Sequence, residues 1–307
     1  MKKINMLVFV LLLVVSAQAQ NVDKLIKEKE VKRIETILAA DDMQGRRTFT
    51  PGIEKAAAFI ADEFKATGLQ TLNNSGSYLQ SFAMVRTKFL GTSGTFDGTT
   101  LDKKDIVVVT TQANLLINET AGFEKITIGK TANLMSEARK LTGLKKNALV
   151  IVDTSFAKIF SGLTRLKSNL FKSDKSVVFV LSTINPTSYS IEAKHEITEM
   201  PLANVVGVLP GKSRPEEIVI FSGHYDHLGI TSKDRNGNVV ADSIFNGAND
   251  DAAGTTAMMV LAKYFKALGN NERTLVFAAF TAEEVGGFGA TYFSNQLDPA
   301  KVMRCLI

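Results

Sequence analysis

The last third of the chain alternates between apolar runs and amphipathic segments, and this rhythm constrains the fold more than any other feature. Four apolar runs predict strands, at 205–209, 217–222, 274–280 and from about 301 onward. Two segments between them predict helices, at 252–268 and 289–296. Strands that alternate with helices predict an α/β fold with a mostly parallel central sheet flanked by helices on both faces.

Two amphipathic segments come before a stretch of different character. Residues 21–40, and the segment that follows Pro51, carry apolar residues at helical spacing. Between about 78 and 194, short β-prone runs are separated by Gly, Asn, Ser and Lys, without a cluster of metal-ligating residue types. We therefore expect residues 20–77 and 195–307 to form one domain, and residues 78–194 to form a small β-rich inserted domain.

The first residues have the pattern of a secretory signal peptide. Lys2 and Lys3 precede an apolar run from Met6 to Val15, and Ala17-Gln18-Ala19 fits a cleavage signal. An apolar run of this length is too short to cross the roughly 30 Å hydrocarbon core of a bilayer. We expect residues 1–19 to be removed and the protein to be periplasmic or secreted, with no membrane span after cleavage.

Composition excludes some classes of function. The formal charge is +5, but no Lys/Arg stripe with interleaved aromatic residues occurs, so we expect no nucleic-acid partner. The chain has one cysteine, Cys305, which excludes a framework of disulfides within the chain. The sequence leaves the oligomeric state open.

Three polar clusters follow the ends of predicted strands, where ligands bind in open α/β sheets. The first is Gly223-His224-Tyr225-Asp226-His227-Leu228-Gly229. His224 at the strand tip could offer a ring nitrogen to a metal, and Asp226 could accept the hydrogen bond of the other ring nitrogen. The alternative is that these histidines are surface or packing residues.

The second and third clusters are acidic. In Asn249-Asp250-Asp251, Asp251 could simply cap the following helix, which leaves Asp250 free to bridge two cations. Glu283 and Glu284 follow a buried strand, where adjacent carboxylates are costly unless they are paired or bind metal. Because neighbouring side chains on an extended backbone point to opposite sides, one glutamate could ligate a metal while the other faces a substrate.

In this order and spacing, the clusters resemble the co-catalytic dizinc aminopeptidases of the bacterial leucyl aminopeptidase and aminopeptidase Y type. Glutamate carboxypeptidase II and the glutaminyl cyclases are more distantly similar. The stretch 41–46, the helix after Pro51 and an apical, protease-associated-like insertion also resemble that group. The resemblance implies a zinc exopeptidase (a metallopeptidase, hence a hydrolase) that acts in proteolysis on a peptide or protein substrate.

The resemblance also implies roles for single residues. His224 is expected to ligate one of two Zn²⁺ ions, Glu284 the other, and Asp250 both. Glu283 is expected to be the general base that assists a two-zinc-bound hydroxide, and Asp226 the catalytic partner of His224. The Asp250–Asp251 peptide bond is expected to be cis. Tyr225, His227 and Asp251 receive no role beyond shaping the loops.

The family has two further ligands, an Asp or Glu just after the strand that begins near 301 and a later His. Neither occurs before Ile307, so we expect the sequence to be truncated at its C-terminus and inactive as written. A carboxypeptidase or a glutaminyl cyclase remains an alternative within the fold, although the Glu283-Glu284 pair favours hydrolysis. A non-catalytic exported binding protein with a decayed metal site is the alternative from another class. The residue preference for the substrate stays open.

Overall fold

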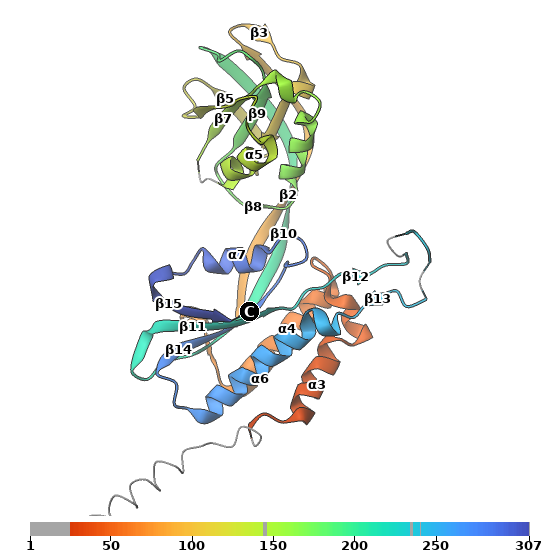
Figure 1. Ribbon diagram of the computed structural model, residues 1–307, viewed down its shortest axis with the longest axis vertical. Helices are drawn as coiled ribbons and strands as arrows, with labels where there is room; N and C mark the ends of the chain where they lie inside the picture. The colour runs from red at the N-terminus through yellow and green to blue at the C-terminus, as the bar shows by residue number, and fades with distance from the viewer. Residues whose placement is uncertain (1–24, 144–145, 234–235, 240, 307) are drawn as a thin grey trace, which may run out of the picture. The chain divides into compact units, whose positions relative to one another are not determined.

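The computed structural model describes residues 25–306 apart from 144–145, 234–235 and 240, so the expected signal peptide, residues 1–19, lies outside the described residues. The chain divides into two compact units, one formed by Met1–Phe82 and Leu202–Ile307 and the other by Ala83–Pro201 (Figure 1). No helix within the described part is long and apolar enough to cross a membrane. The expected insertion, 78–194, has different bounds from the second unit because strands β2 (Leu79–Phe96) and β10 (Tyr189–Leu209) run from one unit into the other.

The sheet of the first unit has the strand order β15-β11-β14-β10, with β1 paired to β10. Its other strands are β1 (Gln70–Thr71), β11 (Arg214–His224), β14 (Arg273–Phe280) and β15 (Val302–Leu306). Strand β11 is parallel to both β14 and β15, whereas β10 is antiparallel to β14. The predicted α/β class is therefore confirmed, and the sheet is mixed because β10 enters it in the opposite direction.

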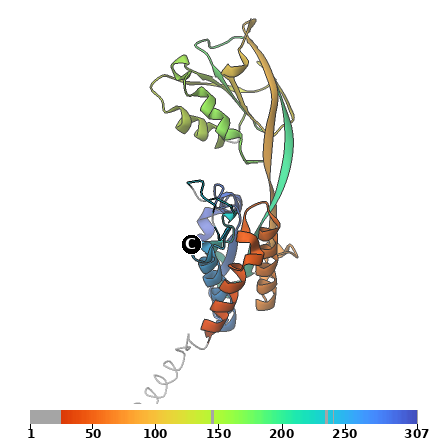
Figure 2. The same cartoon turned by 90° about the vertical axis from the view of Figure 1, so that its right-hand side faces the viewer.

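Helices cover both faces of this sheet (Figures 1 and 2). They are α3 (Glu28–Leu38), α4 (Pro51–Thr67), α6 (Ala253–Leu268) and α7 (Phe288–Ser294). Along β14, Leu275 and Phe277 belong to the core that α3, α4 and α6 share, whereas Val276 packs with Phe293 of α7. The alternation follows from the period of two along a strand, and it explains why the run 274–280 is apolar throughout.

The second unit contains a four-stranded sheet with the order β4-β9-β7-β6. Its strands are β4 (Ile106–Val109), β6 (Glu124–Ile128), β7 (Ala148–Val152) and β9 (Val177–Leu181). Strand β5 (Asn114–Asn118) pairs with β10, while β3 (Thr99–Thr100) and β8 (Leu170–Phe171) pair with β2. All five residues of β7 are buried, because both faces of this sheet are covered.

The second unit also carries helical elements that the sequence analysis did not anticipate. Helix α5 (Leu134–Gly143) and the 3₁₀ segment η5 (Phe160–Lys167) pack on one face of its sheet through Leu134, Phe160 and Leu163. Each contributes few buried apolar residues, so the helical period is weak in the sequence. The remaining short 3₁₀ segments are η1 (Asp41–Arg46), η2 (Leu72–Asn74), η3 (Lys103–Asp105), η4 (Thr154–Phe156) and η7 (Pro299–Lys301).

Candidate metal centre

The three polar clusters of the sequence meet at the carboxyl ends of β11 and β14. These strands are parallel neighbours, and His224 at the tip of β11 lies in register with Phe280 at the tip of β14. Asp250 lies in η6 (Ala248–Ala252), the π-helical turn that leads into α6. The turn is held against β11 by Asp251, whose Oδ2 accepts a hydrogen bond from the His224 amide at 3.1 Å.

Asp251 also caps α6, as the sequence suggested. Its Oδ1 accepts a hydrogen bond from the Gly254 amide at 3.1 Å, and a Cβ added at Gly254 would lie 2.2 Å from the same oxygen. The Asp250–Asp251 peptide bond is cis, as expected. The side chain of Asp250 is 64% exposed, and its Oδ1 lies 3.0 Å from Nε2 of His224.

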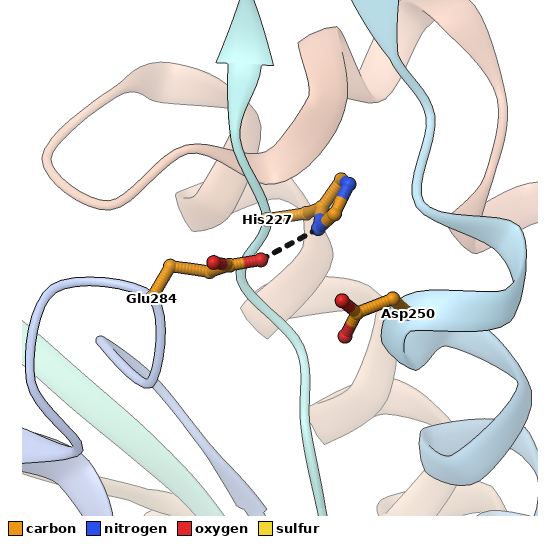
Figure 3. Close-up of side chains that lie close together, drawn as sticks. All are labelled: His227, Asp250 and Glu284. Carbon is orange, nitrogen blue, oxygen red and sulfur yellow. Dashed lines mark hydrogen bonds and ion pairs between the residues drawn. The ribbon is translucent and has the colours of Figure 1, made fainter.

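The ligand atoms of His227, Asp250 and Glu284 lie within 4.8 Å of one another (Figure 3). Nδ1 of His227 is 2.8 Å from Oε1 of Glu284. One imidazole and two carboxylates form a donor set that suits zinc, and His224 adds a second imidazole on Asp250. The site thus contains two histidine–carboxylate pairs, His224–Asp250 and His227–Glu284, and Asp250 lies close enough to the second pair to share a metal with it.

The sequence analysis gave His227 no role at the metal. Strand β11 ends at His224, and the chain then turns so that the His227 amide donates to the Arg46 carbonyl at 3.2 Å. Residue 227 also forms a parallel bridge with Arg47. The direction of the imidazole therefore depends on a contact with η1, which is distant in sequence, and the second His of the first cluster is the only local signal for it.

Asp226 is fully buried and contacts the backbone of the third cluster. Its carboxylate accepts hydrogen bonds from the amides of Glu283 at 3.0 Å and Glu284 at 3.2 Å, and from the Thr48 hydroxyl at 3.0 Å. Burial raises the pKa of Asp226 above its ordinary value, and the backbone hydrogen bonds oppose this shift. The carboxylate therefore fixes the position of the two glutamates.

The expected contact of Asp226 with His224 takes a different form. Nδ1 of His224 is 3.1 Å from the main-chain oxygen of Asp226 and 3.8 Å from its Oδ1. A backbone carbonyl can orient a ligating imidazole as a carboxylate does. Asp226 therefore contacts His224 through its main-chain oxygen and not through its carboxylate.

Glu283 and Glu284 have different surroundings because the chain turns before them. Ala282 has a positive φ of 60°, and the amides of Gly286 and Gly287 donate hydrogen bonds to the Glu283 carbonyl. The side chain of Glu284 is 21% exposed and contacts His227. Glu283 is exposed, and its carboxylate has no hydrogen bond or ion pair with any residue that the structure describes. The turn therefore gives the two carboxylates different environments, one beside His227 and one exposed.

Arg46 connects the loops around the candidate metal centre, and no pattern in the sequence indicated this role. It is fully buried, and its guanidinium donates to the carbonyls of Tyr225, Leu38, Asn246 and Gly247. These acceptors lie on the loop after β11, the end of α3 and the approach to η6. Burial lowers the pKa of Arg46 from its ordinary value, against the attraction of nearby carboxylates, first among them Asp226.

Part of the chain is similar to known peptidases. Residues 204–307 match peptidase family M28. A probable zinc metalloprotease of Leptosphaeria maculans is 34% identical over 96 residues, which are 31% of this chain and 21% of the relative. Aminopeptidase YwaD of Bacillus subtilis is 26% identical over 108 residues, 35% of this chain and 20% of the relative.

Among solved structures, BSAP, a zinc aminopeptidase from Bacillus subtilis, aligns over 91% of this chain and 68% of its own, with a TM-score of 0.46 and 16% identity. The matched part of the chain spans about a fifth of the length of the curated relatives. The segment that holds His224, Asp250 and Glu284 matches the peptidase M28 family, which confirms the resemblance read from the three clusters.

Proposed function

We propose that this chain carries the metal centre of an exported zinc-dependent exopeptidase, an aminopeptidase that removes residues from the N-terminus of peptides. The observation that carries the proposal is the convergence of His227, Asp250 and Glu284 beside the exposed Glu283. The relatives named as zinc metalloprotease and aminopeptidase support the same class. Export rests on the sequence of residues 1–19 alone.

The donor atoms suit two zinc positions that share Asp250. His224 and Asp250 would hold one ion, and Asp250, Glu284 and His227 the other. When bound there, zinc would supply a charge that polarises the scissile carbonyl and lowers the pKa of water. His227 would give one position three protein ligands, the number usual in catalytic zinc sites.

The other residues act on protons and on position. Glu283 would accept the proton of the attacking water and deliver it to the leaving amine, because its carboxylate is exposed beside Glu284 and unpaired among the described residues. Asp226 would keep both glutamates in place through their amides. Arg46 would hold the loops of His227 and Asp250 at a fixed separation.

The proposal is tested with a pair of substrates that differ at the N-terminus. In a purified protein that also supplies the two further ligands expected after Ile307, we expect cleavage of a leucine chromogenic amide with a free amino group and no cleavage of the N-acetylated form. A chelator should abolish cleavage, and added zinc should restore it. Release of ammonia from N-terminal glutamine with no hydrolysis would indicate a cyclase instead, and no zinc-dependent reaction with any of these substrates would contradict the proposal.

A further inference from the structure

A pocket of about 450 Å³ opens beside the metal centre and shares His227 and Glu284 with it. Much of its remaining wall is apolar. Leu228, Ile230, Phe245 and Val285 line it, and each is between 39% and 50% exposed. Its volume is within the range of small-molecule sites, roughly 300–1,000 Å³. Its wall therefore suits an apolar side chain held close to the metal ligands.

Two cationic residues, Arg47 and Lys233, line the pocket, and the side chain of Arg47 is the one held by a close contact. Arg47 lines the pocket and forms a parallel bridge with His227. Its side chain packs on Gly229, where φ is +83° and an added Cβ would lie 2.6 Å from Cβ and 2.9 Å from Cδ of Arg47. The positive φ and the lack of room for a Cβ both require glycine at position 229. The close contact with Gly229 restricts the aliphatic part of the Arg47 side chain. The guanidinium at its end remains able to change position.

The guanidinium of Arg47 has no hydrogen bond or ion pair with any residue in the described part of the chain. Its neighbour Arg46 is the opposite case, since all of its donor nitrogens contact carbonyl oxygens. The carboxylate in the same pocket, Glu284, is paired with His227. The pocket therefore combines apolar walls with one unpaired, planar cation that can bind a carboxylate through two parallel hydrogen bonds.

We propose that this pocket is a substrate subsite that binds a residue with an apolar side chain and a neighbouring free carboxylate, with Arg47 as the specificity-determining residue. The identity of the ligand as part of a peptide rests on the proposed function. The two groups occur together in the last residue of a short peptide. A carboxylate can also come from an acidic side chain, and the experiment separates these sources.

The test measures binding by calorimetry with ligands that an aminopeptidase cannot cleave. N-acetylleucine should bind the wild-type protein roughly tenfold more tightly than N-acetylleucine amide, the ratio that one charge-assisted hydrogen bond supports. Arg47→Gln should bring the ratio close to one, and Arg47→Lys should keep part of it. N-acetylglutamic acid α-amide carries its carboxylate on the side chain, so tighter binding of this ligand would assign the preference to acidic side chains.

The control is Arg165→Gln, which makes the same change in charge at an exposed residue of the second unit and should leave the ratio unchanged. Equal affinities of acid and amide for the wild type, no binding of either, or an unchanged ratio in Arg47→Gln would overturn the inference. Hydrolysis of Leu-Leu and Leu-Leu-amide separates it from the proposed function. If neither dipeptide is cleaved while the acid still binds preferentially, the function fails and the subsite stands. If both are cleaved at equal kcat/KM regardless of Arg47, the subsite fails and the function stands.

Discussion

Replacement of Glu283 by glutamine is expected to lower kcat by at least roughly 100-fold, as loss of a general base does, while bound zinc stays unchanged. Glutamine keeps the size of the side chain and removes its ability to take a proton. The carboxylate of Glu283 is exposed and unpaired within the described residues, so its loss breaks no contact that holds the site. Steady-state kinetics on a leucine chromogenic amide, with zinc content measured on the same sample, provides the check.

Glu284→Gln is the matched control for this result. Glu284 lies beside His227 and within the three-ligand cluster, so its amide variant should lose zinc as well as activity. The reverse pattern, with zinc lost from Glu283→Gln and retained by Glu284→Gln, would show that the roles of the two glutamates are exchanged.

Arg46→Met is expected to lower the free energy of unfolding by about 3 kcal/mol or more. Methionine fills part of the space but donates no hydrogen bond, so four carbonyl oxygens lose a charged donor in a buried site. A buried group left without its partner costs roughly 1–3 kcal/mol, and hydrogen bonds to charged groups are at the upper end of the scale. Urea denaturation followed by circular dichroism measures the change.

The neighbouring residue supplies the control. Arg47→Met removes the same charge from an exposed guanidinium without partners in the described residues, and a substitution of this kind changes stability by no more than about 0.5 kcal/mol. Equal destabilisation by both variants would contradict the structural role given to Arg46.

The sequence indicates the layers of the first unit well, because its strands and helices have strong and different periods. The run 274–280 is apolar on both faces, and α4 has proline at its first position and a left-handed glycine, Gly68, after its last. The direction of β10 was not predictable in this way. A strand that arrives from an inserted unit carries the same apolar pattern whether it enters the sheet parallel or antiparallel.

The part of the site that lies directly after the strand ends was predictable from the sequence. His224 lies beside the end of β14 because β11 and β14 are parallel neighbours, and the turn at Asp250 joins them because Asp251 ties η6 to β11. The position of His227 and the burial of Arg46 depend on η1 packing under the loop after β11. Contacts between segments so distant in sequence leave no local period, so these two residues required the structure.

The central claim is that Asp250 is the shared ligand of a zinc centre, and the zinc content of the Asp250→Ala variant tests it most directly. Asp250 is 64% exposed, so its removal should leave the protein folded, as circular dichroism can verify. The wild-type protein and Glu283→Gln should bind zinc to the same stoichiometry, and Asp250→Ala should lose most of it, because His224 loses its carboxylate partner and the cluster of His227 and Glu284 loses its third ligand. A folded Asp250→Ala protein with the zinc content of the wild type would show that Asp250 is not a shared zinc ligand.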